Sequence, residues 1–127
     1  MKSRWGALLV LALVLVAGFL VISCKKKSNP AAPGGPADVT ISIVGIAGAN
    51  SYSPNPDTLT IGQTVAWHNI DGITHTATSN TGGVFNTGNL AGGSTSSPVT
   101  MMNAGSFPYH CAIHGAAAMS GTLVVMP

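Results

Sequence analysis

The sequence is poor in charge, and the charge it has is unevenly placed. Charged residues make up 6% of the 127 residues, against roughly 25% in an average soluble domain. All five basic residues lie at or before Lys27, and from residue 28 onward the chain has no Lys, no Arg and no Glu. A nucleic-acid-binding domain neutralises phosphates with surface Lys and Arg, so the sequence excludes this class. Catalysis by paired carboxylates or by lysine is also disfavoured, because Asp38, Asp57 and Asp71 are the sole acids and no lysine follows Lys27.

The first 23 residues have the pattern of an export signal. Lys2 and Arg4 precede an uncharged, almost wholly apolar stretch of 18 residues, Trp5–Ile22. This pattern is typical of a secretory signal peptide, although its length is also near the minimum for a membrane-spanning helix. The stretch ends in Leu-Val-Ile-Ser-Cys24, which resembles the lipobox of bacterial lipoproteins.

The lipobox resemblance implies cleavage before Cys24 and a diacylglycerol on its thiol. The alternative is an uncleaved N-terminal helix in which Cys24 has no role. Under both interpretations we expect the protein to lie outside the cytoplasm, on the periplasmic or cell-surface side, held to a membrane.

The chain is expected to divide into three parts. Residues 1–23 form the signal peptide, residues 24–37 a tether that begins with the lipidated Cys24, and residues 38–127 a single domain. In the tether, Lys25–Lys27 would lie beside lipid headgroups. Pro30, Pro33 and Pro36 are spaced three apart, as on one edge of a polyproline II helix. We therefore expect a semi-rigid spacer with a reach of roughly 30–40 Å.

The domain is predicted to be all-β. Apolar and polar residues alternate over short runs that Gly, Pro, Asn, Ser and Thr separate, and no stretch has the period of an amphipathic helix. Such a pattern favours an antiparallel sandwich or barrel. The predicted strands are 39–43, 59–61, 64–69, 74–78, 84–85, 97–101, 106–111 and 121–126.

One cluster of residues carries metal-binding chemistry. Cys111, His114 and Met119 fall within nine residues between the last two predicted strands, and His75 follows a turn far upstream. If Cys24 is lipidated, Cys111 has no disulfide partner, and it is a buried small hydrophobe, a reactive thiol or a metal ligand. A thiolate, two imidazoles and a thioether suit copper in both oxidation states, and trigonal His₂Cys with a weak axial Met is the blue-copper arrangement.

With these residues the chain resembles the cupredoxins, specifically the small plastocyanin- and pseudoazurin-like proteins. The resemblance covers about residues 39–125. The matching segments are Val65–Trp67 with Asn69, Asp71 and His75-Thr76, then Gly105–Cys111, and the pattern Cys-x2-His-x4-Met followed by Ser120–Val125. One departure is Ile113, where many relatives have Pro before the loop histidine.

The resemblance implies a Greek-key antiparallel β-sandwich or barrel of about eight strands with one copper ion per chain. It implies Cys111 as equatorial thiolate, His75 and His114 as equatorial imidazoles, and Met119 as axial thioether. The Thr74 carbonyl is a candidate for a further approach to copper, and Thr76 for a hydrogen bond within the loop. His68 and His110 are expected to be exposed, with His110 alternatively a lateral exit for electrons.

The implied function is a membrane-tethered one-electron carrier cycling between Cu(I) and Cu(II). Its expected partners are redox proteins such as cytochromes or oxidase and reductase complexes, and we expect a monomer that is not an enzyme, because filled coordination leaves no open position for a substrate. The alternatives are a copper-buffering or copper-delivering protein, an enzyme subunit, and a metal-free adhesive sandwich, which leaves Cys111 unexplained. Small or apolar residues flank His114, so partner docking is expected to depend little on ionic strength.

Overall fold

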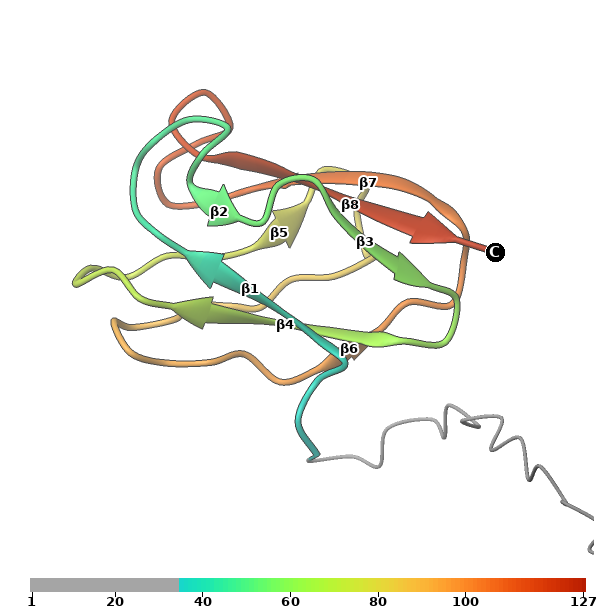
Figure 1. Ribbon diagram of the computed structural model, residues 1–127. Coiled ribbons are helices and arrows are strands. Elements are labelled where there is room, and N and C mark those ends of the chain that lie inside the picture. The colour runs from blue at the N-terminus through green and yellow to red at the C-terminus, as the bar shows by residue number, and fades with distance from the viewer. Residues whose placement is uncertain (1–34) are drawn as a thin grey trace, which may run out of the picture.

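The computed structural model describes residues 35–127, so the predicted signal peptide and Cys24 lie outside the described residues. Within this range no helix is long and apolar enough to cross a membrane. The described chain is built from eight strands (Figure 1): β1 (Val39–Ile43), β2 (Tyr52–Ser53), β3 (Asp57–Thr60), β4 (Thr64–Asn69), β5 (Thr78–Ser79), β6 (Val99–Thr100), β7 (Gly105–His110) and β8 (Ser120–Met126).

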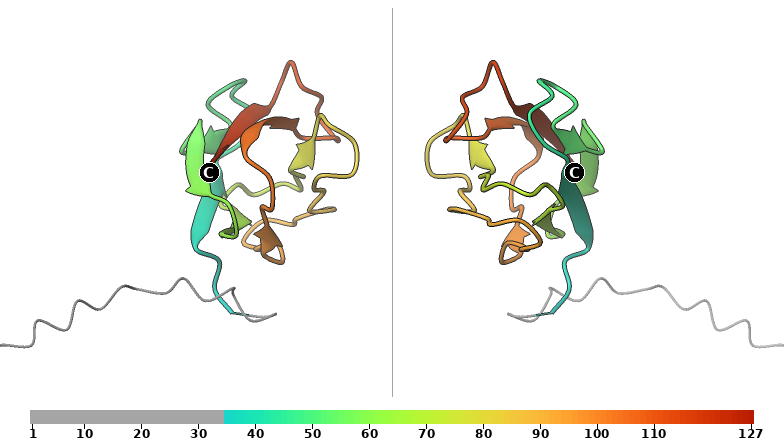
Figure 2. Two further views of the ribbon diagram at one scale, coloured as in Figure 1. Left: turned by 90° about the vertical axis from the view of Figure 1, so that its right-hand side faces the viewer. Right: turned by 90° about the vertical axis from the view of Figure 1, so that its left-hand side faces the viewer.

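The strands form two four-stranded sheets, which confirms the predicted all-β sandwich. The strand order is β2-β1-β4-β6 in one sheet and β3-β8-β7-β5 in the other. Both sheets are mixed rather than wholly antiparallel, because β1 pairs with β4 in parallel and β3 pairs with β8 in parallel. The reason is the path of the chain: β3 belongs to the second sheet, so β4 returns beside β1 in the same direction. The end-on views show the strands surrounding the core (Figure 2).

The sequence pattern locates the long strands well and the short ones poorly. Residues 39–43 and 64–69 are strands as predicted. Of the predicted strand 74–78 only Thr78 lies in a strand, at the start of β5, and residues 84–85 form no strand. Gly83 has a φ of 82° just before them, a conformation that glycine adopts readily, and the chain turns there. Phe85 is nevertheless buried.

Four aromatic rings fill much of the core. Trp67 of β4 stacks on Phe85 with ring centroids 4.9 Å apart, and its ring is edge-on to Tyr109 of β7 at 5.6 Å. Tyr52 of β2 packs edge-on against Tyr109 at 4.7 Å. Gly121 of β8 makes room for the Tyr109 ring, since a Cβ there would lie 2.4 Å from a ring carbon. Burying side chains of this size contributes about 1.5–3 kcal/mol each.

The architecture brings the chemically interesting loops to one end of the sandwich. β4 ends at Asn69 and β7 ends at His110, and β8 begins beside β7 with His110 opposite Ser120. The loops that follow β4 and β7 therefore meet at the left-hand side of Figure 1. These two loops carry His75 and the segment 111–119.

Candidate metal centre

His75, Cys111 and His114 converge at this end of the sandwich. One ligand atom from each lies within 4.8 Å of the others. The Cys111 Sγ is 3.9 Å from Nδ1 of His75 and 3.4 Å from Nδ1 of His114. His75 and Cys111 have no exposed surface, whereas His114 is half-buried. The structure thus brings together three of the four residues that the resemblance implied as copper ligands, with one of them reaching the surface.

Backbone hydrogen bonds hold the ligand loop in a tight turn. The Gly115 N–H donates to the Cys111 carbonyl at 2.8 Å, and the Met119 N–H donates to the Gly115 carbonyl at 3.0 Å. The Cys111 N–H donates back to the Met119 carbonyl at 3.3 Å. Met119, the fourth implied ligand, is fully buried, and its backbone lies beside that of Cys111.

His75 is fixed from a different part of the chain. Its N–H and carbonyl exchange two hydrogen bonds with Leu90, at 3.0 and 2.8 Å. Its Nε2 lies 2.8 Å from Oδ2 of Asp71, four residues earlier. Because a carboxylate only accepts, Nε2–H is the donor, and the Nδ1 lone pair is left facing Cys111. This hydrogen bond holds the pKa of the Asp71 carboxyl below its ordinary value, with a smaller contribution from the Gly72 N–H.

Asp71 contacts His75, a candidate ligand, and the sequence did not indicate this role for it. A carboxylate that accepts from the far nitrogen of a ligating histidine fixes the ring and raises its basicity. The available signal was its position, because Asp71 is one of three acids in the domain and precedes His75 by four residues. Asn69 supports the arrangement, since its Oδ1 accepts from the Asp71 N–H at 3.0 Å.

The Cys111 thiol lies in surroundings that favour its ionised form. Burial alone would raise the pKa of the thiol, but the hydrogen bond from the Thr76 N–H, together with the neighbouring His75 and His114, lowers the pKa to about 6. The Thr76 N–H lies 3.4 Å from Sγ. The thiolate is the form that binds metals.

The Thr76 side chain bonds the other ligand loop rather than its own, accepting from the Ala112 N–H at 2.8 Å. The two other histidines are half-buried rather than exposed, because each ring bonds a neighbouring side chain. His68 Nδ1 lies 2.8 Å from Oγ1 of Thr95, and His110 Nδ1 lies 2.6 Å from Oδ1 of Asn80.

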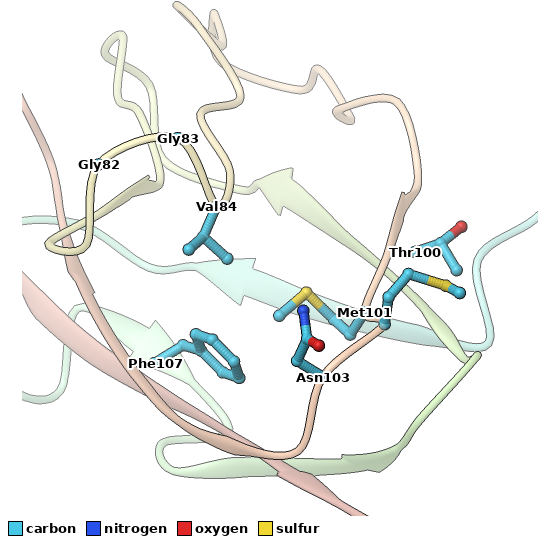
Figure 3. A pocket seen from close by; sticks show the side chains of 8 residues that line it. Gly82, Gly83, Val84, Thr100, Met101, Asn103 and Phe107 are labelled. Carbon is cyan, nitrogen blue, oxygen red and sulfur yellow. The ribbon is translucent and has the colours of Figure 1, made fainter.

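A pocket of about 350 Å³ elsewhere in the domain does not belong to this centre. It lies between Val84, Met101, Asn103 and Phe107 (Figure 3), and none of the residues implied as ligands lines it. Met101 is buried and Met102 is 66% exposed. The Met101 thioether therefore belongs to the core and the Met102 thioether to the surface. This arrangement does not favour a metal site shared by the two.

The donor set fits a copper ion. Two imidazole nitrogens and a thiolate converge in a buried position, and none of these three donors is an oxygen of the kind that Mg²⁺ and Ca²⁺ require. The protons on His75 Nε2 and on the Thr76 amide are directed to acceptors within the site. A soft cation that takes nitrogen and sulfur is what the arrangement can hold.

Solved structures with the same fold are copper proteins. No protein-family model and no curated protein matches the chain. A purple cupredoxin from Nitrosopumilus maritimus matches with a TM-score of 0.60 and 26% identity, over 70% of this chain and 100% of that one. A copper-containing nitrite reductase from Thermus scotoductus SA-01 matches with a TM-score of 0.60 and 28% identity over 78% of this chain, which spans 25% of the reductase chain.

An amicyanin variant in its oxidised form matches with a TM-score of 0.57 and 23% identity, over 76% of this chain and 86% of that one, and supports the fold alone. The chain therefore has the cupredoxin fold. Its His-Cys-His-Met set, with three donors already converged, fits a type 1 copper site holding one ion.

Proposed function

We propose that this chain is a membrane-tethered one-electron carrier that works outside the cytoplasm with a single type 1 copper site. The observation that carries the proposal is the convergence of Cys111 Sγ with Nδ1 of His75 and of His114 in a buried position. His75, Cys111, His114 and Met119 are the four residues that would hold the ion. A copper ion bound there would exchange single electrons between its Cu(II) and Cu(I) states.

The protein's own residues support transfer of electrons rather than conversion of a substrate. His75 and Cys111 have no exposed surface, so water and substrates are kept from the centre, and with four ligand positions filled no open position remains. The loop and strand contacts limit rearrangement when the charge of an ion changes. His114 is half-buried and offers the short route from the centre to a partner.

The surface around His114 supports docking of a redox partner through apolar contacts. Five of the exposed large apolar side chains belong to loops at the metal end, namely Val44, Ile46, Ile70, Ile73 and Ile113. Apolar patches of this kind mark interaction sites. We infer that the partners are redox proteins, such as cytochromes or oxidase and reductase complexes, that meet a monomer of this chain.

Membrane attachment through a lipid on Cys24 is part of the proposal. It is supported by the lipobox-like residues 20–24 and the apolar stretch before them. The mass of the chain isolated from membranes tests it: we expect loss of residues 1–23 and addition of a diacylglycerol. A Cys24→Ala chain that partitions into detergent and is cleaved like the parent would contradict the lipid anchor.

Loading with Cu(II) tests the copper site. We expect intense visible absorption from thiolate-to-copper charge transfer and a narrow electron-spin hyperfine pattern, both lost in Cys111→Ser. Slow release of the ion to a chelator is the expected behaviour of a carrier, whereas rapid release would favour copper buffering or delivery. A folded protein that stays colourless with copper, or that prefers zinc, contradicts the proposal.

A further inference from the structure

A buried tyrosine from a strand that carries no ligand reaches the metal centre. Tyr52 lies in the two-residue strand β2 and is 1% exposed. Its hydroxyl donates to the carbonyl oxygen of Thr76 at 2.6 Å, across 24 residues of sequence. Thr76 directly follows His75. Tyr52 is thus tied to the residue that also contacts the Cys111 sulfur.

Thr76 receives this hydrogen bond at a point where three restraints meet. Its N–H donates to Cys111 Sγ at 3.4 Å, and its Oγ1 accepts from the Ala112 N–H at 2.8 Å. Thr76 is 4% exposed, so water cannot replace these contacts. With the carbonyl held by Tyr52, the residue has little freedom to swing its amide away from the sulfur.

The amide-to-sulfur hydrogen bond has an electrostatic consequence. An N–H dipole directed at a thiolate stabilises negative charge on the sulfur. The sulfur carries more negative charge when the bound ion is reduced, because the cation then withdraws less electron density. A firmly held Thr76 amide therefore favours the reduced state and raises the reduction potential.

We propose, building on the proposed function, that Tyr52 is a positioning residue for the thiolate of Cys111. By holding the Thr76 carbonyl, its hydroxyl keeps the Thr76 amide against the sulfur and so sets the potential of the copper site. Burial raises the pKa of the Tyr52 hydroxyl, so it remains a donor throughout the neutral range.

The chain contains a matched control for this role. Tyr109 is also fully buried, and its ring lies 4.7 Å from that of Tyr52. Its hydroxyl has no hydrogen-bond partner in the described part of the chain. Tyr52→Phe and Tyr109→Phe therefore remove the same atom from neighbouring rings, but only Tyr52→Phe breaks a hydrogen bond to the metal loops.

Amide hydrogen exchange in the metal-free full chain, kept in detergent, tests the contact without copper. We expect Tyr52→Phe to speed exchange at the Thr76 amide by about tenfold relative to a core amide such as Leu123, since a lost hydrogen bond loosens the residue locally. Tyr109→Phe should leave this ratio within about twofold of the parent. An equal change at Thr76 in both variants, or none in either, overturns the proposal.

The copper-loaded chain supplies the second readout. Tyr52→Phe should lower the equilibrium constant for reduction by a fixed donor by about two- to tenfold, tenfold being ~59 mV for a one-electron couple. It should also shift the thiolate-to-copper absorption band, and Tyr109→Phe should do neither. Equal potentials in the two variants overturn the role in setting the potential.

The two measurements separate this inference from the proposed function. If the unmodified chain binds no copper, the proposed function fails, while exchange at Thr76 still decides whether Tyr52 holds the loop. If Tyr52→Phe does not fold, the unmodified chain decides instead. A slowly exchanging Tyr52 hydroxyl proton in its NMR spectrum supports the contact, and a freely exchanging one overturns it.

Discussion

The Nε2–H of His75 donates to the carboxylate of Asp71 at 2.8 Å, and this contact determines which ring nitrogen faces the Cys111 sulfur. Asp71 is 31% exposed in its side chain while His75 is wholly buried. A surface carboxylate therefore reaches inward to orient a buried imidazole. It also places a negative charge beside the proposed copper site.

Asp71→Asn should weaken this orientation and remove the charge. We expect Cu(II) affinity to fall by about 10–100-fold and the reduction potential to rise, because the more highly charged ion loses more stabilisation. Competition with a chelator and redox titration measure the two effects. Asp57→Asn is the control, since Asp57 contacts the Thr58 N–H rather than a histidine. Equal effects from both variants would count against a specific role for Asp71.

The two histidines should differ in their response to removal of the side chain. His114 is half-buried and His75 has no exposed surface. We expect added imidazole to reach the gap in His114→Gly and restore the visible absorption of the copper-loaded protein. In His75→Gly the same addition should restore much less colour. Comparable rescue of both variants would show that His114 is not the side chain that opens to solvent.

Electron exchange with a partner should be almost independent of salt. In the loops at the metal end that carry these apolar side chains and His114, residues 44–51, 70–77 and 111–119, Asp71 is the one acidic or basic residue apart from histidine. We expect the bimolecular rate constant with a small cytochrome to change by less than about twofold as ionic strength rises from about 10 to 150 mM, which shortens the Debye length from roughly 30 to 8 Å. Ile113→Glu should introduce a salt dependence. A steep fall in the unmodified protein would exclude an apolar docking face.

Gly121 should be intolerant of a side chain. A Cβ there would lie 2.4 Å from a carbon of the Tyr109 ring. This ring is fully buried and packed against Tyr52 and Trp67, so it has little room to move away. We expect Gly121→Ala to reduce the free energy of unfolding by about 1–3 kcal/mol, as overpacking of a core does. Gly82→Ala is the control, because a Cβ at Gly82 meets nothing within 4 Å. Denaturant unfolding measures both variants, and equal stability would refute this packing argument.

Acid should remove the contribution that the Asp38 carboxylate makes to the stability of the folded state. Hydrogen bonds from the Thr64 backbone and hydroxyl hold the pKa of this carboxyl below its ordinary value. A carboxyl whose pKa is lower in the folded state than in the unfolded state stabilises the folded state at pH values above its unfolded-state pKa. This stabilisation is lost as the pH falls through its folded-state pKa. We therefore expect the unmodified protein to have a higher melting temperature than Asp38→Asn at pH 7. The difference between the two melting temperatures should narrow toward about pH 3. A gap that stays constant with pH would contradict this.

The sequence predicted those parts of the fold that have a strong local pattern. Strict alternation identified β1 to the residue, the Gly62-Gln63 turn marked the start of β4, and the spacing of Cys111, His114 and Met119 located the ligand loop. β2 has two residues and gives no period, so Tyr52 carried no signal. The parallel pairing of β1 with β4 depends on the route of the chain between sheets, which side-chain alternation does not encode.

The supporting contacts of the site were harder to foresee than its ligands. The Tyr52 hydroxyl reaches Thr76 across 24 residues, and nothing in the neighbourhood of either residue points to the other. Asp71 and His75 are close in sequence, but they lie on an irregular loop where a spacing of four has no fixed geometry. Their contact follows from Leu90 and Asn69, which hold the two ends of that loop.

The site also joins the two halves of the sandwich. His75 follows a strand of one sheet, and Cys111, His114 and Met119 lie between two strands of the other. An ion bound by all four residues would link loops from both sheets at this end of the sandwich. Because it would bind the folded chain and not the unfolded one, it would raise the free energy of unfolding. The melting temperature of the protein should therefore rise with the copper available to it, so that in a metal-starved cell the metal-free chain would unfold and be degraded more readily.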